Sequence, residues 1–183
     1  MLKKLNTLDA VFITLMAACG LAVKPIVGPF FKLIGSALLI PSGSMAGAIY
    51  MIWPMLALLV VKRFGTATMV GLIQGIVVMV TGIYGSHGVL TLITYTLPGI
   101  VIDLVFFLVR HSKNQWLMMM PAAMGNLIGA LLVSVVIMHL PKIPLLIALV
   151  PSFLFGALGG YFSWIIYKWL IKTFPIFNKT DLQ

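Results

Sequence analysis

The sequence predicts an all-α integral membrane protein with six transmembrane helices. Of its 183 residues, 62% are hydrophobic and 8% are charged, and the mean hydropathy is +1.17. The few charges stand in short segments between long apolar runs. A soluble domain needs more polar residues to cover its surface, whereas apolar runs of about 20 residues match the hydrocarbon thickness of a bilayer. Residues 1–183 are therefore expected to form a single membrane-embedded domain.

Six apolar runs are long enough, or nearly so, to cross the membrane. They cover residues 8–23, 45–61, 66–84, 89–109, 116–139 and 144–171. A further apolar piece, residues 29–40, is too short to cross and is flanked by Pro25, Gly28, Pro41 and Gly43. Because Pro and Gly interrupt helices, we predict that this piece is a short interfacial or re-entrant helix after the first span.

The basic residues predict the orientation. With the N-terminus inside, nine Lys and Arg fall in cytoplasmic segments and three, Lys24, Lys32 and Lys142, in outer segments. This excess on one side follows the positive-inside rule, so both termini are expected to be cytoplasmic. The positive charges flank the apolar runs, where they can meet lipid headgroups, and form no dense basic stripe of the kind that binds nucleic acid.

The composition argues against an enzyme and against a resident metal or cofactor. Only Asp9, Asp103 and Asp181 are acidic, so the sequence offers no carboxylate pair for acid–base catalysis and no carboxylate cluster for a metal ion. It also lacks a phosphate-binding loop and a G-x-S-x-G motif. The single cysteine, Cys19, excludes an internal disulfide. Asp103 is predicted inside the fourth span, where it either bonds to a neighbouring helix or has a functional role.

Small residues spaced four apart occur in several predicted spans. They are Ala18 and Ala22, Gly71 and Gly75, and Gly125 and Gly129. This spacing places both members of a pair on one face of a helix and allows close helix–helix approach in lipid.

The remaining polar and aromatic residues gather toward the predicted outer side. The candidates for ligand contact are Tyr50, Trp53, Gln74, Tyr84, His87, Tyr95 and Asn126. Aromatic walls with a few hydrogen-bonding groups are typical of small-molecule pockets. Tyr and Trp also favour membrane interfaces for their amphipathic character alone, so the amides of Gln74 and Asn126 carry the stronger signal.

Taken together, the six short spans, the 183-residue length and the lack of an ATP-binding loop resemble the substrate-binding S component of an energy-coupling factor (ECF) transporter. Within that group, about a third of the chain is similar to the YkoE-type subfamily, which is associated with thiamine or its hydroxymethylpyrimidine precursor. The similar pieces are residues 49–53 (IYMIW), 62–65 (KRFG), Gly82, 85–88 (GSHG), 98–99 (PG) and 105–110 (VFFLVR).

The resemblance implies an ABC importer for a vitamin or cofactor precursor, in a prokaryotic plasma membrane. The partners would be a transmembrane coupling subunit, on which Ala18 and Ala22 would dock, and two cytosolic ATPases that use the ATP. The subfamily carries carboxylates in the third span where this chain has Gly71 and Val78. A buried thiazolium cation would be stabilised by such carboxylates, and this chain lacks them. We therefore expect a neutral ligand such as a pyrimidine or pyridine alcohol.

Two other functions remain open at this point. The chain could be a self-sufficient secondary transporter of a small neutral solute, although such proteins usually place acidic or histidine relays inside the bundle. It could also be a membrane scaffold protein that binds no ligand.

Overall fold

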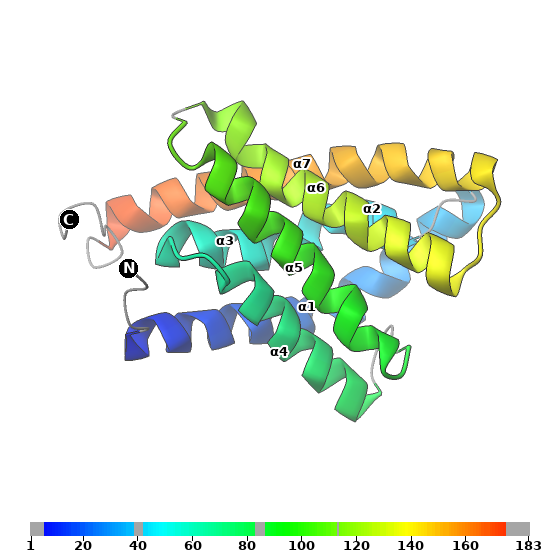
Figure 1. Ribbon diagram of the computed structural model, residues 1–183, viewed down its shortest axis with the longest axis horizontal. Helices are drawn as coiled ribbons and strands as arrows, with labels where there is room; N and C mark the ends of the chain where they lie inside the picture. Colours follow the sequence, from blue (N-terminus) through cyan, green and yellow to red (C-terminus); the bar gives the residue numbers. More distant parts are fainter. Residues whose placement is uncertain (1–5, 39–41, 83–86, 113, 175–183) are drawn as a thin grey trace.

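The computed structural model describes residues 6–38, 42–82, 87–112 and 114–174, and these residues are helical apart from short connections (Figure 1). The elements are α1 (Thr7–Leu38), α2 (Ser42–Tyr50), α3 (Ile52–Val61), α4 (Thr66–Thr81), α5 (Leu90–Val109), α6 (Gln115–Leu132), the π-helical turn η1 (Val133–Ile137) and α7 (Lys142–Thr173). Within the described residues, five segments are long and apolar enough to cross a membrane, and α4, with 16 residues, is a shorter apolar helix. The predicted all-α membrane class is confirmed.

The predicted break after the first span is wrong. α1 is one helix of 32 residues that contains both Pro25 and Pro29. Each proline removes one backbone N–H, so the carbonyl oxygens of Leu21 and Pro25 lose their helical donors. Membrane helices tolerate such gaps when neighbouring groups compensate. Lys24 consequently lies inside α1 and not in an outer connection.

The predicted second span forms the centre of the bundle. It consists of α2 and α3, which meet at Met51. Pro54 lacks the N–H that would bond to the Tyr50 carbonyl, and this explains the interruption there. All residues from 54 to 61 are buried. The other membrane-length helices have far more exposed surface, so α3 is the element around which they pack.

The helices alternate in direction between two ends of the molecule. α4, α5, α6 and α7 pack in chain order, while α1 packs against α2, α3 and α4. α1 begins and α7 ends at the same end, on the left in Figure 1, where the α3–α4 and α5–α6 turns also lie. We call this the basic end, because its described segments carry Lys62, Arg63, Arg110, Lys168 and Lys172. The opposite end carries Lys32 and Lys142.

Asp103 joins α5 to the first turn of α4. Its side chain is 1% exposed and accepts hydrogen bonds from the backbone N–H groups of Ala67 (3.1 Å) and Thr68 (2.8 Å), and from the Thr68 hydroxyl (2.6 Å). The residue at the N-terminal cap of α4 is Gly65, which has no side chain to cap the helix. Asp103 supplies the missing acceptors for the N–H groups at the N-terminus of α4. The structure therefore gives Asp103 a helix-packing role.

Candidate functional site

Lys24 lies buried between two of the tyrosines predicted to contact a ligand. Its side chain is 8% exposed. The ammonium nitrogen lies 3.7 Å from the centroid of the Tyr95 ring and 5.7 Å from that of the Tyr50 ring. Both distances fall within cation–π range. Lys24 thus brings together side chains from α2 and α5 that are 45 residues apart in the sequence.

The positive charge of Lys24 has no carboxylate beside it in the described part of the chain. Asp9 lies 15 residues earlier on α1, about 22 Å along the helix axis, and Asp103 bonds to α4. Desolvating an ammonium costs several kcal/mol, whereas cation–π contacts return about 1–2 kcal/mol each. The surroundings of Lys24 therefore favour a neutral amine or, if the ammonium is retained, an additional negative group beside it.

One turn earlier on the same face of α1, Gly20 lies against Trp53 and Gln74. A Cβ at Gly20 would lie 3.1 Å from Trp53 Cδ1 and would collide with the Gln74 amide nitrogen. Gln74 is buried and donates to the Ala17 carbonyl at 3.3 Å. The Trp53 indole nitrogen is buried without a hydrogen-bond partner among the described residues.

These side chains form one group, which we call the Lys24 cluster. Its members are Lys24, Tyr50, Trp53, Gln74 and Tyr95, from α1, α2, α3, α4 and α5 respectively. Lys24 is 17 residues from the start of α1, about 26 Å from the basic end, and Tyr95 is five residues from the start of α5, about 8 Å from the opposite end. The Lys24 cluster therefore lies toward the end predicted to face outward.

Asn126 makes its contacts elsewhere. It is 4% exposed, and its amide nitrogen donates to the carbonyls of Ser44 (3.1 Å) and Ser152 (2.7 Å). Gly47 and Gly156 leave room for it, because a Cβ at either position would collide with its side chain. The Asn126 amide thus joins α2, α6 and α7, and both of its donor positions are used.

Two further candidates lie at the connection before α5. Tyr84 is outside the described residues. His87 is half-buried, and its backbone N–H donates to the Thr91 hydroxyl at 2.8 Å. This bond orders the start of α5, one turn before Tyr95.

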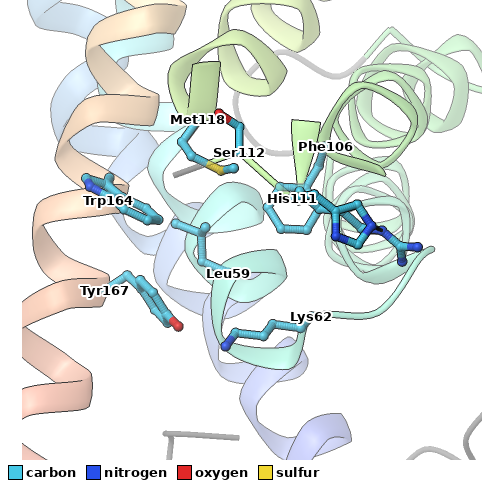
Figure 2. A pocket seen from close by; sticks show the side chains of 9 residues that line it. Leu59, Lys62, Phe106, His111, Ser112, Met118, Trp164 and Tyr167 are labelled. Carbon is cyan, nitrogen blue, oxygen red and sulfur yellow. Dashed lines mark hydrogen bonds between the residues drawn. The ribbon is translucent and has the colours of Figure 1, made fainter. Parts of the chain in front are cut away.

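A cavity of about 480 Å³ opens at the basic end and contains none of the predicted ligand residues. Figure 2 shows Trp164 and Tyr167 of α7 on one side and Phe106 and His111 on the other, with Lys62 at the edge. Arg110 also lines it and stacks on Phe107, with 3.7 Å between the guanidinium carbon and the ring centroid. The cavity is therefore cationic and aromatic, and distinct from the Lys24 cluster.

The other side of α1 is exposed and carries the predicted docking residues. Ala18 and Ala22 are both exposed, whereas Ala17 and Gly20 are buried. A shallow surface hollow, also of about 480 Å³, is lined by Ala10, Val11, Thr14, Leu15 and Ala18. α1 therefore presents the Lys24 face to the bundle and a small-residue face outward.

Residues 8–129, two thirds of the chain, match the family model for the permease component of an ABC-type cobalt transport system. The chain belongs to this family. It is thus a multi-pass membrane component of an ABC-type import system, which confirms the coarser part of the expectation drawn from the resemblance. No curated protein and no solved structure matches the chain significantly. Within the described ranges, no three His, Cys, Asp or Glu residues come together in a group that could hold a metal ion.

Lys24 is a member of this candidate site that the sequence did not predict. It was assigned to an outer connection because Pro25 follows it and Gly28 lies one turn later. The available signal was the uninterrupted hydropathy on both sides of it. A single Lys inside a long apolar run is expensive in a membrane and commonly marks a functional position.

Proposed function

We propose that the chain is the substrate-binding S component of an ECF-type ABC importer, and that it captures a vitamin-like small molecule at the Lys24 cluster. The observation that carries this proposal is the convergence of five polar or aromatic side chains from five helices on one face of α1. Apolar walls with a few convergent polar groups are typical of small-molecule sites in helical bundles. The position toward the outer end suits capture from outside the cell.

The two faces of α1 support a link between capture and transport. Gly20 and Lys24 face the cluster, whereas Ala18 and Ala22 face outward. Each pair is offset from the other by two residues, which is about 200° around a helix. We propose that a transmembrane coupling subunit docks on the Ala18–Ala22 face and that two cytosolic ATPases supply the energy. A ligand that moves α1 would then alter the docking surface directly.

An organic ligand is favoured over the metal ion that the family description mentions. The Lys24 cluster presents an ammonium, two phenols, an indole and an amide. Divalent metal ions prefer carboxylate, imidazole or thiolate ligands, and an ammonium repels them. We therefore propose a vitamin or cofactor precursor as the cargo.

The role of Asp103 counts against a self-sufficient proton-driven transporter. Its oxygens accept three hydrogen bonds that fix α4. A proton relay needs a carboxyl group that can exchange its proton as the protein changes shape, and a carboxylate committed to a helix terminus is poorly suited to that role. An S component needs no such relay, because its partners supply the energy. A scaffold protein, in turn, would need no buried Lys24 cluster.

Purification of a tagged copy from its native membrane tests the proposal. We expect a transmembrane coupling protein and two ATPases to be recovered and identified by mass spectrometry. Tyr50→Ala and Gln74→Ala should leave this assembly intact but abolish uptake of the cargo. Recovery of the chain alone, under conditions that preserve a known complex of this type, would instead favour a self-sufficient transporter.

A further inference from the structure

We infer that the molecule captured at the Lys24 cluster carries a carboxylate, and that this carboxylate pairs with the ammonium of Lys24. The inference rests on the proposed function, because it names the chemical class of the cargo. It departs from the neutral ligand expected from the sequence, where Lys24 was placed outside the bundle.

The first support is the electrostatic environment of Lys24. The ammonium contacts the rings of Tyr50 and Tyr95. Of the two carboxyl groups in the described residues, that of Asp103 bonds to α4 and that of Asp9 lies in the first turn of α1, far from Lys24. The next basic residue on α1, Lys32, is eight residues away and exposed, so it does not share the site. A buried cation is stabilised far more by an opposite charge than by ring faces.

The second support is an unsatisfied hydrogen-bond donor against Gly20, one turn of α1 from Lys24. The Trp53 indole N–H is buried and has no partner in the described residues. An indole and an ammonium only donate, and the Tyr50 hydroxyl can do so as well. A carboxylate only accepts, through two oxygens, so it complements this set.

The single charge of Lys24 favours a carboxylate over a phosphate or a neutral group on the cargo. A phosphate monoester carries about −1.5 to −2 charges at neutral pH and would leave negative charge uncompensated beside a single lysine. A neutral pyrimidine or pyridine alcohol would leave the ammonium without a counter-ion. One carboxylate matches one ammonium. The half-buried side chains of Tyr50 and Trp53 offer aromatic surface to a planar body attached to that carboxylate.

The test compares acids with their amides, which have nearly the same shape but no charge. The probes are benzoate and benzamide, nicotinate and nicotinamide, and 4-aminobenzoate and 4-aminobenzamide. Each is titrated into the full-length protein in lipid nanodiscs, with tryptophan fluorescence and thermal unfolding as readouts. We expect at least one acid to bind ten-fold or more tightly than its amide. This preference should fall to two-fold or less in Lys24→Met and persist in Lys24→Arg.

The controls separate ligand binding from folding. Lys24→Met removes a buried charge at nearly constant length, so it should unfold at a temperature equal to or above that of the wild type. Lys32→Met removes an exposed charge from the same helix and should leave the preference unchanged. If Lys24→Met does not fold, Lys24→Gln takes its place. The comparison of acid with amide in the wild-type protein can be made without any variant.

Two results would overturn the inference. One is equal binding of acid and amide in all three pairs by the wild type. The other is a preference for acids that survives in Lys24→Met or Lys24→Gln. Either result, obtained with protein that still assembles with a coupling subunit and ATPases, rejects the carboxylate and leaves the transport role standing. Failure of that assembly rejects the transport role itself.

Discussion

Asp103 accepts a 2.6 Å hydrogen bond from the hydroxyl of Thr68, and this contact ties α5 to the first turn of α4. The same carboxylate accepts the backbone N–H groups of Ala67 and Thr68. The cap of α4 thus comes from a different helix, 35 residues later in the sequence. Packing of α4 on α5 and formation of the α4 N-terminus are therefore coupled.

Removing this cap should destabilise the protein strongly. Asp103→Ala leaves two backbone donors and a hydroxyl without their acceptor, and we expect a loss of about 3 kcal/mol in the free energy of unfolding. Thr68→Val removes one donor and should cost about 1 kcal/mol. Thermal or denaturant unfolding in detergent measures both. In the Asp103→Ala background, Thr68→Val should add little, because its partner is already gone. Additive losses would show that the two side chains act independently.

The close approach of α4 and α5 should make Gly99 intolerant of a side chain. A Cβ at Gly99 would lie 2.5 Å from the Ala67 carbonyl oxygen and 2.9 Å from the Thr68 Cα, so the helices must separate. We expect Gly99→Ala to cost about 2 kcal/mol or more, measured by unfolding in detergent.

Gly43→Ala is the matched control, since a Cβ at Gly43 meets nothing within 4 Å. It should leave stability unchanged or raise it by up to about 1 kcal/mol through helix propensity. Equal effects of the two substitutions would mean that helix propensity, and not the α4–α5 contact, determines the result.

The sequence predicted the helices better than it predicted their interruptions. The predicted bounds agree closely with the observed helices for five of the six apolar runs, because the membrane selects length and hydropathy directly. Pro25 and Gly28 predicted a break that does not occur, since a packed membrane helix tolerates a proline. Pro54, within a run predicted to be continuous, does coincide with an interruption at Met51. Local residue preferences alone could not separate these two cases, because neighbouring helices decide which gap is tolerated.

The structure brings four of the seven candidate ligand residues together and places a fifth, Asn126, elsewhere. Tyr50, Trp53, Gln74 and Tyr95 meet in one cluster, while Asn126 joins three other helices. Gln74 and Asn126 gave the same signal in the sequence, since each is an amide inside an apolar run. Which groups each amide meets depends on helix rotation and packing. Those are tertiary properties that one sequence does not reveal.

The orientation predicts which connections are accessible from outside the cell. In a Cys19→Ala background, Lys142→Cys at the start of α7 should react in intact cells with a membrane-impermeant maleimide. His111→Cys, beside the cavity at the basic end, should react only after the membrane is permeabilised. Both positions are exposed, so access and not burial decides the labelling. The reverse pattern would place the basic end outside and contradict the positive-inside assignment.

The outward face of α1 predicts how assembly can be disrupted without loss of the fold. Ala18→Leu adds bulk at an exposed position beside the surface hollow, so the protein should remain stable. A coupling subunit that packs closely on Ala18 and Ala22 would be forced away, because close helix contacts in lipid depend on small side chains. We expect recovery of the coupling subunit in a pull-down to fall at least ten-fold.

Val150→Phe is the control for a general effect of added bulk, because Val150 is 64% exposed on α7. It should leave the recovery unchanged. Ala17→Leu, at a fully buried position one residue away from Ala18, should instead destabilise the bundle itself. If Ala18→Leu and Val150→Phe weaken assembly equally, the docking surface is not specific to α1. If neither substitution weakens assembly, the docking surface lies on another helix.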